Sequence, residues 1–225
     1  IRELVSQGMP AAQALKEVKE STPRAEHALK LAMEKRPVML NRAPSLHKHS
    51  IQSFKPVLME GKSIRLNPLI VSGFNADFDG DTMGIHVPIE PEAVDEAWTM
   101  LPSKNIFKHG DNSVVPNVSQ DYLLGVYFLS KNGRKTNQSF PNWRAAQKAG
   151  LKYTDIFMLN GKPRTIGQIL LNKPLPESLR DYERVLDKKA VSTLLTEVAK
   201  KHNKIFPEVI NNLKDLGYMY AFNRG

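Results

Sequence analysis

The sequence predicts an α+β protein in which a central group of short strands lies between helical segments. Apolar residues recur at helical spacing before residue 36 and again after residue 186, whereas residues 38–87 hold short apolar runs broken by Asn, Gly and Pro. The 225 residues suffice for one large or two modest domains with cores. We expect a helical lead-in at 1–35 and a strand-rich region at 36–129. A linker at 130–141 would then lead to a region at 142–225 that is mixed at first and helical at its end.

The composition is that of an ordinary globular protein, with 41% apolar and 24% charged residues. No apolar run reaches the roughly 18 residues of a membrane span, and no secretory signal is visible in Ile1-Arg2-Glu3-Leu4. The absence of cysteine excludes disulfides and Cys-type zinc sites in this stretch. The formal net charge of +9 suits a polyanionic partner, although many proteins are equally basic. Because the chain lacks an initiating Met and stops within a predicted helix, we expect it to be a piece of a longer polypeptide.

Residues 1–35 are predicted to be helical. Apolar residues lie at helical spacing between 11 and 18, and Thr22-Pro23 is typical of an N-cap followed by proline in the first helical turn. Pro37 ends the second helix, so that residues 38–40 are predicted to form a strand before the loop 41–44.

Three further strands are predicted in the central region. Residues 51–59 and 63–71 are expected to be strands joined by a turn at Glu60-Gly61, and residues 82–87 form the next strand before Pro88. The stretch between the last two strands would therefore be a strand-to-strand connection.

The rest of the chain alternates helical and irregular segments. Helices are predicted at 92–101 and, strongly apolar and buried, at 120–129, with short strands and turns at 105–116. The polar residues 130–141 are the best linker candidate. Beyond them we predict a helix with Trp143 as a core anchor, a strand at 155–159, a short element from 165, and paired helices at 187–202 and 207–217.

The connection at 75–81 carries three aspartates at alternate positions, Asp77, Asp79 and Asp81. Carboxylates this close repel one another and need a counter-charge. A hard cation bound by oxygen ligands supplies one, and Gly80 allows the backbone to bend so that the carboxylates turn inward.

Two other kinds of acidic loop share features with this stretch. A calcium-binding EF-hand loop needs Gly after the third acidic residue and Glu at the twelfth position, where this chain has Thr82 and Pro88. An acidic solvated loop stays open, although Phe78 and the apolar flanks favour a loop held against a core. Three Asp with few other ligands suit magnesium and two-metal phosphoryl transfer.

The residues Asn75–Asp81, NADFDGD, resemble the signature motif of the largest catalytic subunit, beta-prime, of multi-subunit RNA polymerases. The resemblance extends over most of the chain, and residues 36–88 are its specific part. The chain departs from the family at Val118, because the family usually has Pro just before Ser119-Gln120-Asp121. Further matching stretches are 36–47, 51–54, 56–58, 60–62, 119–121, 124–125 and, more loosely, 217–221.

The resemblance implies a fold for each part of the chain. Residues 36–129 would be the barrel and active-site region, a portion of a double-psi beta-barrel from which the aspartate loop projects. Part of that barrel would lie upstream of Ile1. Residues 142–225 would lie by the secondary channel through which nucleotides enter.

The resemblance also implies roles for single residues. Asp77, Asp79 and Asp81 would be the catalytic residues that hold Mg2+. Arg42, which alone would be interpreted as a surface cation, would reach the incoming nucleotide and its sugar, since its planar fork suits phosphate and hydroxyl oxygens. Asn75 would contact the ribose hydroxyls.

The implied function is DNA-directed RNA synthesis by magnesium-dependent nucleotidyl transfer. Implied partners are the other polymerase subunits (beta, alpha and a sigma-type factor), a DNA template, RNA and nucleoside triphosphates, in the cytoplasm with the nucleoid and without a membrane. Two rivals remain: a non-catalytic, metal-stabilised nucleic-acid-binding module, and a basic nucleic-acid-binding protein whose acidic loop is incidental.

Two further groups of residues contain side chains that commonly bind metals or nucleic acids. His47 and His49 invite a metal interpretation, but no Cys or third His lies near, so we expect structural roles for both. The sequence supports two interpretations equally for a group of four basic residues: they extend a nucleic-acid groove, or they form a solvated strand face. These residues are Lys48, Lys55, Lys62 and Arg65.

Overall fold

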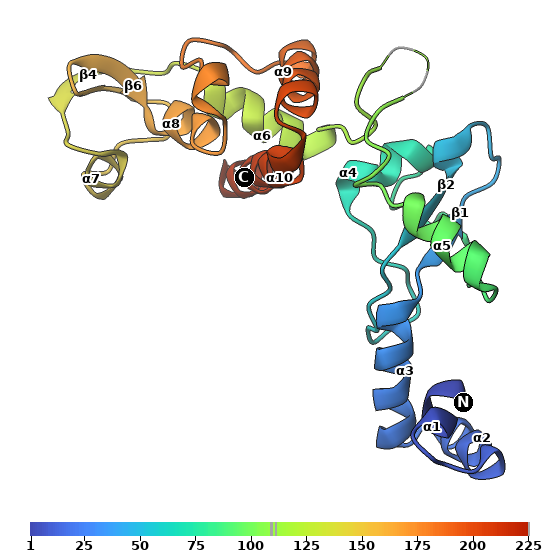
Figure 1. Cartoon of the computed structure of the whole chain (residues 1–225). Helices are drawn as coiled ribbons and strands as arrows, with labels where there is room; N and C mark the ends of the chain where they lie inside the picture. The colour runs from blue at the N-terminus through green and yellow to red at the C-terminus, as the bar shows by residue number, and fades with distance from the viewer. Residues whose placement is uncertain (109, 111, 225) are drawn as a thin grey trace. The chain divides into compact units, whose positions relative to one another are not determined.

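The computed structural model describes residues 1–108, 110 and 112–224 and divides into two compact units, Ile1–Asn105 and Ile106–Gly225 (Figure 1). Each unit combines helices with a three-stranded sheet, which confirms the α+β class. Within the described residues, every helix is too short or too polar to cross a lipid bilayer. The four predicted segments, 1–35, 36–129, 130–141 and 142–225, are not tested by this division and stay a prediction.

The predicted helices at the N-terminus are confirmed as α1 (Arg2–Ser6), α2 (Ala11–Lys19) and α3 (Pro23–Lys35). Thr22 caps α3, because its side chain accepts a hydrogen bond from the backbone N–H of Ala25 at 3.3 Å and proline follows in the first turn. The three helices share a small core, formed by Leu4, Ala14 and Ala28 with Met9 against them.

The sheet of the first unit has the strand order β2-β1-β3 and is antiparallel. Leu40 of the central strand pairs with Gln52 on one side and with Ile85 on the other. Leu40 is buried and packs with Ile70 and Phe74, so this core joins the sheet to the segment before the aspartates. The strands are β1 (Val38–Asn41), β2 (Ile51–Phe54) and β3 (Gly84–His86), with the 3-10 turn η1 (Lys48–Ser50) before β2.

The predicted strand at 63–71 is wrong, because residues Pro68–Val71 form the short helix α4 and Ser72–Phe74 the 3-10 turn η2. Asn67 caps α4 by accepting a hydrogen bond from the N–H of Leu69 at 3.1 Å, and Pro68 occupies the first turn. A short apolar run fits a buried helix as well as a strand, so periodicity could not decide between them.

The neighbouring strands are shorter than predicted. β2 ends at Phe54, two residues before Pro56, which has no backbone N–H to donate to a sheet. β3 covers only the middle of the predicted strand 82–87. The aspartates therefore connect a helical turn to a strand, and not two strands.

In the part of the chain that the structure describes, the first sheet does not close into a barrel. Apolar side chains after β2 and on β3 are exposed, among them Val57, Leu58 and Ile85. Helix α5 (Pro91–Thr99) follows β3 and confirms the helix predicted at 92–101.

Two long helices form the centre of the second unit, α6 (Gln120–Ser130) and α10 (Phe206–Arg224). They cross with their backbones almost in contact, because a Cβ added to Gly125 would lie 1.9 Å from the carbonyl oxygen of Gly217. The rings of Tyr122 and Tyr218 pack 4.9 Å apart beside this crossing. The helices predicted at 120–129 and 187–202 are confirmed by α6 and by α9 (Lys188–Lys201), and the 3-10 turn η4 (Asn203–Ile205) joins α9 to α10. The helix predicted at 207–217 is present, but its predicted end at Gly217 is wrong, because α10 continues to Arg224 and Gly217 serves the close crossing with α6 instead.

The predicted short strands and turns at 105–116 appear as one isolated bridge, between Phe107 and Val114. Residues 109 and 111 lie outside the described part of this segment.

The second unit also holds the sheet β4-β5-β6, in which β4 runs parallel and β6 antiparallel to β5. Strand β4 lies inside the stretch predicted as a linker, where Thr136 donates its hydroxyl to the carbonyl of Ile156 at 2.8 Å. Trp143 packs against a core of Ala146, Phe157 and Ile166, which confirms it as a core anchor. The elements are β4 (Lys135–Ser139), α7 (Trp143–Lys148), β5 (Ile156–Leu159), β6 (Lys162–Thr165) and α8 (Ile166–Asn172).

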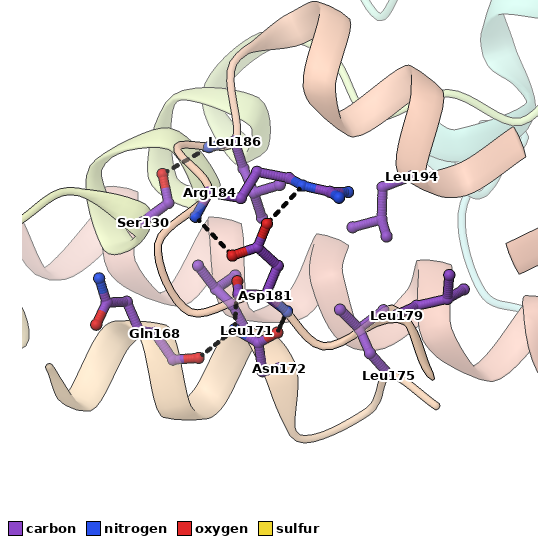
Figure 2. Close-up of a pocket in the computed structure, with 10 residues that line it drawn as sticks. All are labelled: Ser130, Gln168, Leu171, Asn172, Leu175, Leu179, Asp181, Arg184, Leu186 and Leu194. Carbon is purple, nitrogen blue, oxygen red and sulfur yellow. Dashed lines mark hydrogen bonds and ion pairs between the residues drawn. The ribbon is translucent and has the colours of Figure 1, made fainter. Parts of the chain in front are cut away.

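A buried polar network ties the irregular segment 173–187, which includes η3 (Glu177–Leu179), to helices α6 and α8 (Figure 2). The Asn172 side chain donates to the carbonyl of Gln168 at 2.9 Å and accepts from the N–H of Asp181 at 2.8 Å. Ser130 Oγ accepts from the N–H of Leu186 at 2.9 Å. These polar groups pair with one another, so we assign the small cavity between them a structural role.

Candidate metal centre

The aspartate loop is fixed at its N-terminal end by buried apolar residues. Leu69, Ile70 and Val71 of α4 and Phe74 of η2 are all buried. Asn75 then takes a left-handed conformation, with φ 49° and ψ 45°, which ends the 3-10 turn and starts the loop. Asn is among the few residues that adopt this conformation at small cost.

At its C-terminal end the loop enters the sheet. Gly84, the first residue of β3, pairs with Asn41 at the end of β1. Gly80 has φ 121°, a conformation that favours glycine, as predicted for a tight bend. Ala76 and Met83 pack onto the core of Leu40 and Phe74, so the loop is held at both ends while its middle is exposed.

The bend brings the three carboxylates together. One carboxylate oxygen from each of Asp77, Asp79 and Asp81 lies within 4.8 Å of the others. All three residues are exposed. In the described part of the chain, this is the only group of three or more His, Cys, Asp or Glu side chains close enough to share an ion.

The electrostatics of the triad are uneven. A hydrogen bond shared with Asp77, and then the charge of Asp77, raises the pKa of Asp79. Hydrogen bonds from Arg42 and from the backbone N–H of Asp77 lower the pKa of Asp81. Asp77 and Asp79 therefore retain mutual repulsion that a bound cation would relieve, while Asp81 already has a counter-charge.

That counter-charge is the guanidinium of Arg42, which follows β1. Its Nε donates to Asp81 Oδ2 at 2.9 Å and its Nη2 to Asp81 Oδ1 at 3.2 Å, a two-pronged ion pair. Each of the two side chains is 22% exposed. The hydrogen bond to Asp81 raises the pKa of Arg42 in turn, so the guanidinium stays charged. The structure thus brings Arg42, one of the two predicted substrate-binding residues, into direct contact with the triad.

Asn75, the other predicted substrate-binding residue, lies two positions before Asp77, and it is exposed. Its backbone N–H donates to the carbonyl of Ser72 at 3.2 Å. The side chain is therefore on the accessible part of the loop, beside the first carboxylate in sequence.

Two features of the site were not predicted. The contact between Arg42 and Asp81 joins residues 39 positions apart, and no spacing rule in the sequence signals it. Below the loop, Gln52 Nε2 donates to the carbonyl of His49 at 2.9 Å, and a Cβ added to Gly73 would lie 2.7 Å from the same nitrogen. Gln52 therefore fits closely beneath η2, the turn that leads into the loop.

His47 and His49 stay outside the metal centre. Their rings lie 5.8 Å apart edge to face, and His49 is buried. This arrangement agrees with the structural roles predicted for them.

The donor set suits a hard divalent cation. It consists of carboxylate oxygens alone, on an exposed loop with room for waters and phosphate oxygens. Three carboxylates lie beside a single guanidinium, so Arg42 can neutralise only one of the three charges.

Comparison with known proteins places this site in a family context. The family model described as "RNA polymerase Rpb1, domain 2" matches residues 6–102, which include the aspartate loop and β1 to α5. The curated relatives match more of the chain. A DNA-directed RNA polymerase subunit beta' from Sulfurihydrogenibium sp. (strain YO3AOP1) is 37% identical over 221 residues, covering 92% of this chain and 14% of that protein.

Two further relatives carry the same name. The subunit beta' of Thermotoga petrophila is 35% identical over 226 residues, covering 91% of this chain and 13% of the relative. That of Syntrophobacter fumaroxidans is 38% identical over 229 residues, covering 94% of this chain and 17% of the relative. The chain thus spans only about a seventh of the length of the curated relatives it matches.

Proposed function

Because the chain belongs, over nearly all of its length, to the family of the RNA polymerase beta' subunit, we propose that it carries the catalytic aspartates of a DNA-directed RNA polymerase. In the proposed reaction the 3′-hydroxyl oxygen of RNA bonds to the α-phosphorus of a nucleoside triphosphate, and pyrophosphate leaves. The hydroxyl proton passes to solvent. The observation that supports this best is the meeting of three carboxylates within 4.8 Å on a loop held at both ends.

We propose that Asp77, Asp79 and Asp81 hold magnesium through their carboxylate oxygens. A bound magnesium ion supplies positive charge that stabilises the attacking and leaving oxygens of the transfer. The chain contributes the placement: α4 and β3 hold the two ends of the loop, and the bend at Gly80 turns the carboxylates toward one another.

Arg42 and Asn75 are proposed to bind the nucleotide. The guanidinium of Arg42 has five donors in a planar fork, of which Asp81 takes two, so donors remain for phosphate or sugar oxygens. Asn75 has an exposed side chain next to the triad in sequence and can bond ribose hydroxyls. Its contact with the 2′-hydroxyl would favour ribonucleotides.

The proposed function requires more than this chain. Its partners would be the other polymerase subunits (beta, alpha and a sigma-type factor), a DNA template, RNA and nucleoside triphosphates, in a cytoplasmic, nucleoid-associated enzyme. We further propose that β1, β2 and β3 belong to a double-psi beta-barrel completed by polypeptide outside residues 1–225. The exposed apolar side chains of Val57, Leu58 and Ile85 support this, since such side chains are normally covered.

Chelation of divalent ions separates this function from a non-catalytic, metal-stabilised module. In the polymerase assembled with its partner subunits, EDTA should abolish RNA synthesis and magnesium should restore it. The thermal unfolding midpoint of the chain itself should shift by less than about 2 °C, because buried apolar residues already hold the loop. A large fall in that midpoint would favour the metal-stabilised module, and synthesis that survives chelation would contradict the proposal.

A further inference from the structure

A buried glutamine lies beneath the turn from which the aspartate loop starts. Gln52, on β2, is 4% exposed, although glutamine side chains are mostly found on protein surfaces. Its Nε2 donates a hydrogen bond to the backbone carbonyl of His49 at 2.9 Å. A buried amide is costly unless it is hydrogen-bonded, whereas an apolar side chain fills a core without that requirement. A buried amide at this position therefore needs a reason other than the filling of space.

The amide of Gln52 also lies against Gly73, the middle residue of η2. A Cβ added to Gly73 would lie 2.7 Å from Gln52 Nε2 and 3.3 Å from the carbonyl oxygen of His49. Gly73 is buried and does not have a positive φ, so a side chain is excluded here by lack of space and not by the backbone conformation. The position of η2 is therefore set by its close contact with the Gln52 amide and with η1.

From η2 the constraint reaches the aspartates through two backbone hydrogen bonds. The N–H of Asn75 donates to the carbonyl of Ser72 at 3.2 Å, and the N–H of Ala76 donates to the carbonyl of Val71 at 3.3 Å. Asp77 follows directly in the sequence. A displacement of η2 would therefore move the first carboxylate of the triad.

The other end of the loop is linked to the same glutamine through the sheet. The backbone of Gln52 pairs with Leu40 of the central strand, and Leu40 pairs with Ile85 of β3 on its other side. Ile85 is the second residue of the strand that the loop enters. Gln52 thus contacts the start of the loop with its side chain and is in register with the end of the loop through its backbone.

We propose that Gln52 is a positioning residue for the acidic triad, because its amide holds η2 where the carboxylates of Asp77, Asp79 and Asp81 can meet. Gln52 acts through the loop and not by contact with the ion. Alteration of residues that orient metal ligands typically lowers metal affinity or activity about 10- to 100-fold. The identity of the ion rests on the proposed function, whereas the fixing of the loop rests on the contacts of Gln52 alone.

The first measurement is amide hydrogen exchange, followed residue by residue by NMR in the full chain. Gln52→Ala removes the amide, and Gln52→Met removes it while keeping a side chain of similar length. In both variants, exchange at Asn75 and Ala76 should become at least about tenfold faster, whereas exchange in β1 should change less than about threefold. Equal acceleration in β1 and in the loop would overturn the proposal, since a general loss of stability would then explain it.

Ser53→Ala is the matched control. Ser53 is buried on the same strand, and the alternation of side chains along a strand places it on the opposite face from Gln52. Exchange at residues 75 and 76 should stay as in the wild type. Acceleration there equal to that in the Gln52 variants would overturn a specific role for the amide.

The second measurement is the magnesium concentration that gives half-maximal RNA synthesis in the polymerase assembled with its partner subunits. Gln52→Ala and Gln52→Met should each raise this concentration about tenfold, because the carboxylates no longer converge as well. Ser53→Ala should leave it unchanged. A wild-type magnesium requirement in both Gln52 variants would overturn the proposal.

A double-mutant cycle with Gly73 tests whether the effect passes through the contact between the amide and η2. Gly73→Ala alone should raise the magnesium requirement about tenfold, because its Cβ would collide with Gln52 Nε2. In the Gln52→Ala background the same change should add less than about twofold, since the colliding amide is gone. Effects that simply multiply would overturn the proposal.

The two measurements separate this inference from the proposed function. Faster exchange at residues 75 and 76 in the Gln52 variants, together with RNA synthesis that survives chelation, would contradict only the proposed function. Wild-type exchange in those variants, together with synthesis that chelation abolishes, would contradict only the role of Gln52.

Discussion

The two units of the chain differ sharply in charge although they are similar in size. The first unit, Ile1–Asn105, has 13 Lys and Arg against 13 Asp and Glu, and the second, Ile106–Gly225, has 19 against 10. The whole net charge of +9 is therefore carried by the second unit. The balanced unit holds the acidic triad, whereas residues 131–173 of the basic unit hold nine Lys and Arg against one acidic residue, the buried Asp155.

Net charge alone is therefore a poor guide to the place of a catalytic site in this chain. A basic chain suggests a polyanion partner, but the candidate catalytic site lies in the neutral unit, where Arg42 offsets only part of the charge of the triad. The chain keeps its acidic triad in one unit and its excess of basic residues in the other.

The largest expected effect comes from the triad. In the assembled polymerase, Asp79→Asn should lower the rate of RNA synthesis by about 10³-fold or more, because a neutral amide replaces one of three cation ligands. Asp215→Asn is the matched control, since Asp215 is an exposed acid of the second unit paired with Lys214 at 3.0 Å. The control should retain nearly full activity. Comparable losses of activity in the two variants would contradict a specific catalytic role for Asp79.

The second effect is on stability and concerns the second unit. Gly217→Ala should lower the free energy of unfolding by about 3 kcal/mol or more, because its Cβ would lie 2.1 Å from the carbonyl oxygen of Tyr122. The two helices would have to separate. Gly84→Ala, where the nearest atom is 3.8 Å away, should cost less than about 1 kcal/mol. Urea unfolding of both variants measures the difference, and equal costs would argue against the close crossing of α6 and α10.

A third prediction concerns the arginine that joins the triad to β1. Arg42→Ala should raise KM for the nucleotide about tenfold in the assembled enzyme, since donors proposed for the substrate are lost. Arg42→Lys should recover only part of this, because lysine cannot make the two-pronged contact. Steady-state kinetics with Arg24→Ala, an exposed arginine of α3 in the same unit, serve as the control. Unchanged KM in Arg42→Ala would remove its substrate role.

The smallest expected effect is a difference in stability between two variants that each lose a helix N-cap, one in each unit. Thr165→Ala should destabilise the chain by about 1 to 2 kcal/mol, since Thr165 is buried and forms a reciprocal capping box with Gln168 at 3.1 Å. Thr22→Ala should cost about 0.5 kcal/mol, because its cap bond to Ala25 is longer, at 3.3 Å. Thermal unfolding of both variants measures the two losses of stability. A loss in Thr165→Ala no larger than that in Thr22→Ala would contradict this prediction.

The sequence predicted the helices best where capping residues or regular apolar spacing mark them. Thr22-Pro23 signalled the start of α3. The helix at 187–202 was predicted from its apolar spacing, and the structure adds that Asp187 caps α9 by accepting a hydrogen bond from the N–H of Ala190 at 2.7 Å. The apolar run before the aspartates was misassigned because its length suits either a buried helix or a strand. Strand β4 was missed because it is polar and exposed, without the alternation that marks a half-buried strand.

The candidate site could be predicted only where it is local in sequence. Asp77, Asp79 and Asp81 lie within five positions, so a bend at Gly80 was enough to suggest that their carboxylates meet. The contact of Arg42 with Asp81 and the fit of Gln52 under Gly73 depend on how β1 and β2 are placed beside the loop. Such contacts follow from the tertiary fold, which local patterns do not specify.

The most direct test of the central claim maps the ion by chemistry at its site. In the assembled polymerase, Fe2+ replaces Mg2+ and reduces added hydrogen peroxide to hydroxide and a hydroxyl radical, becoming Fe3+, and the radical cleaves the nearest backbone. We predict cuts at residues 75–81 and also at 41–45, because Arg42 contacts Asp81, and we predict their loss in Asp79→Asn. Cleavage spread evenly along the chain, or unchanged in that variant, would contradict the claim that the three aspartates hold the catalytic ion.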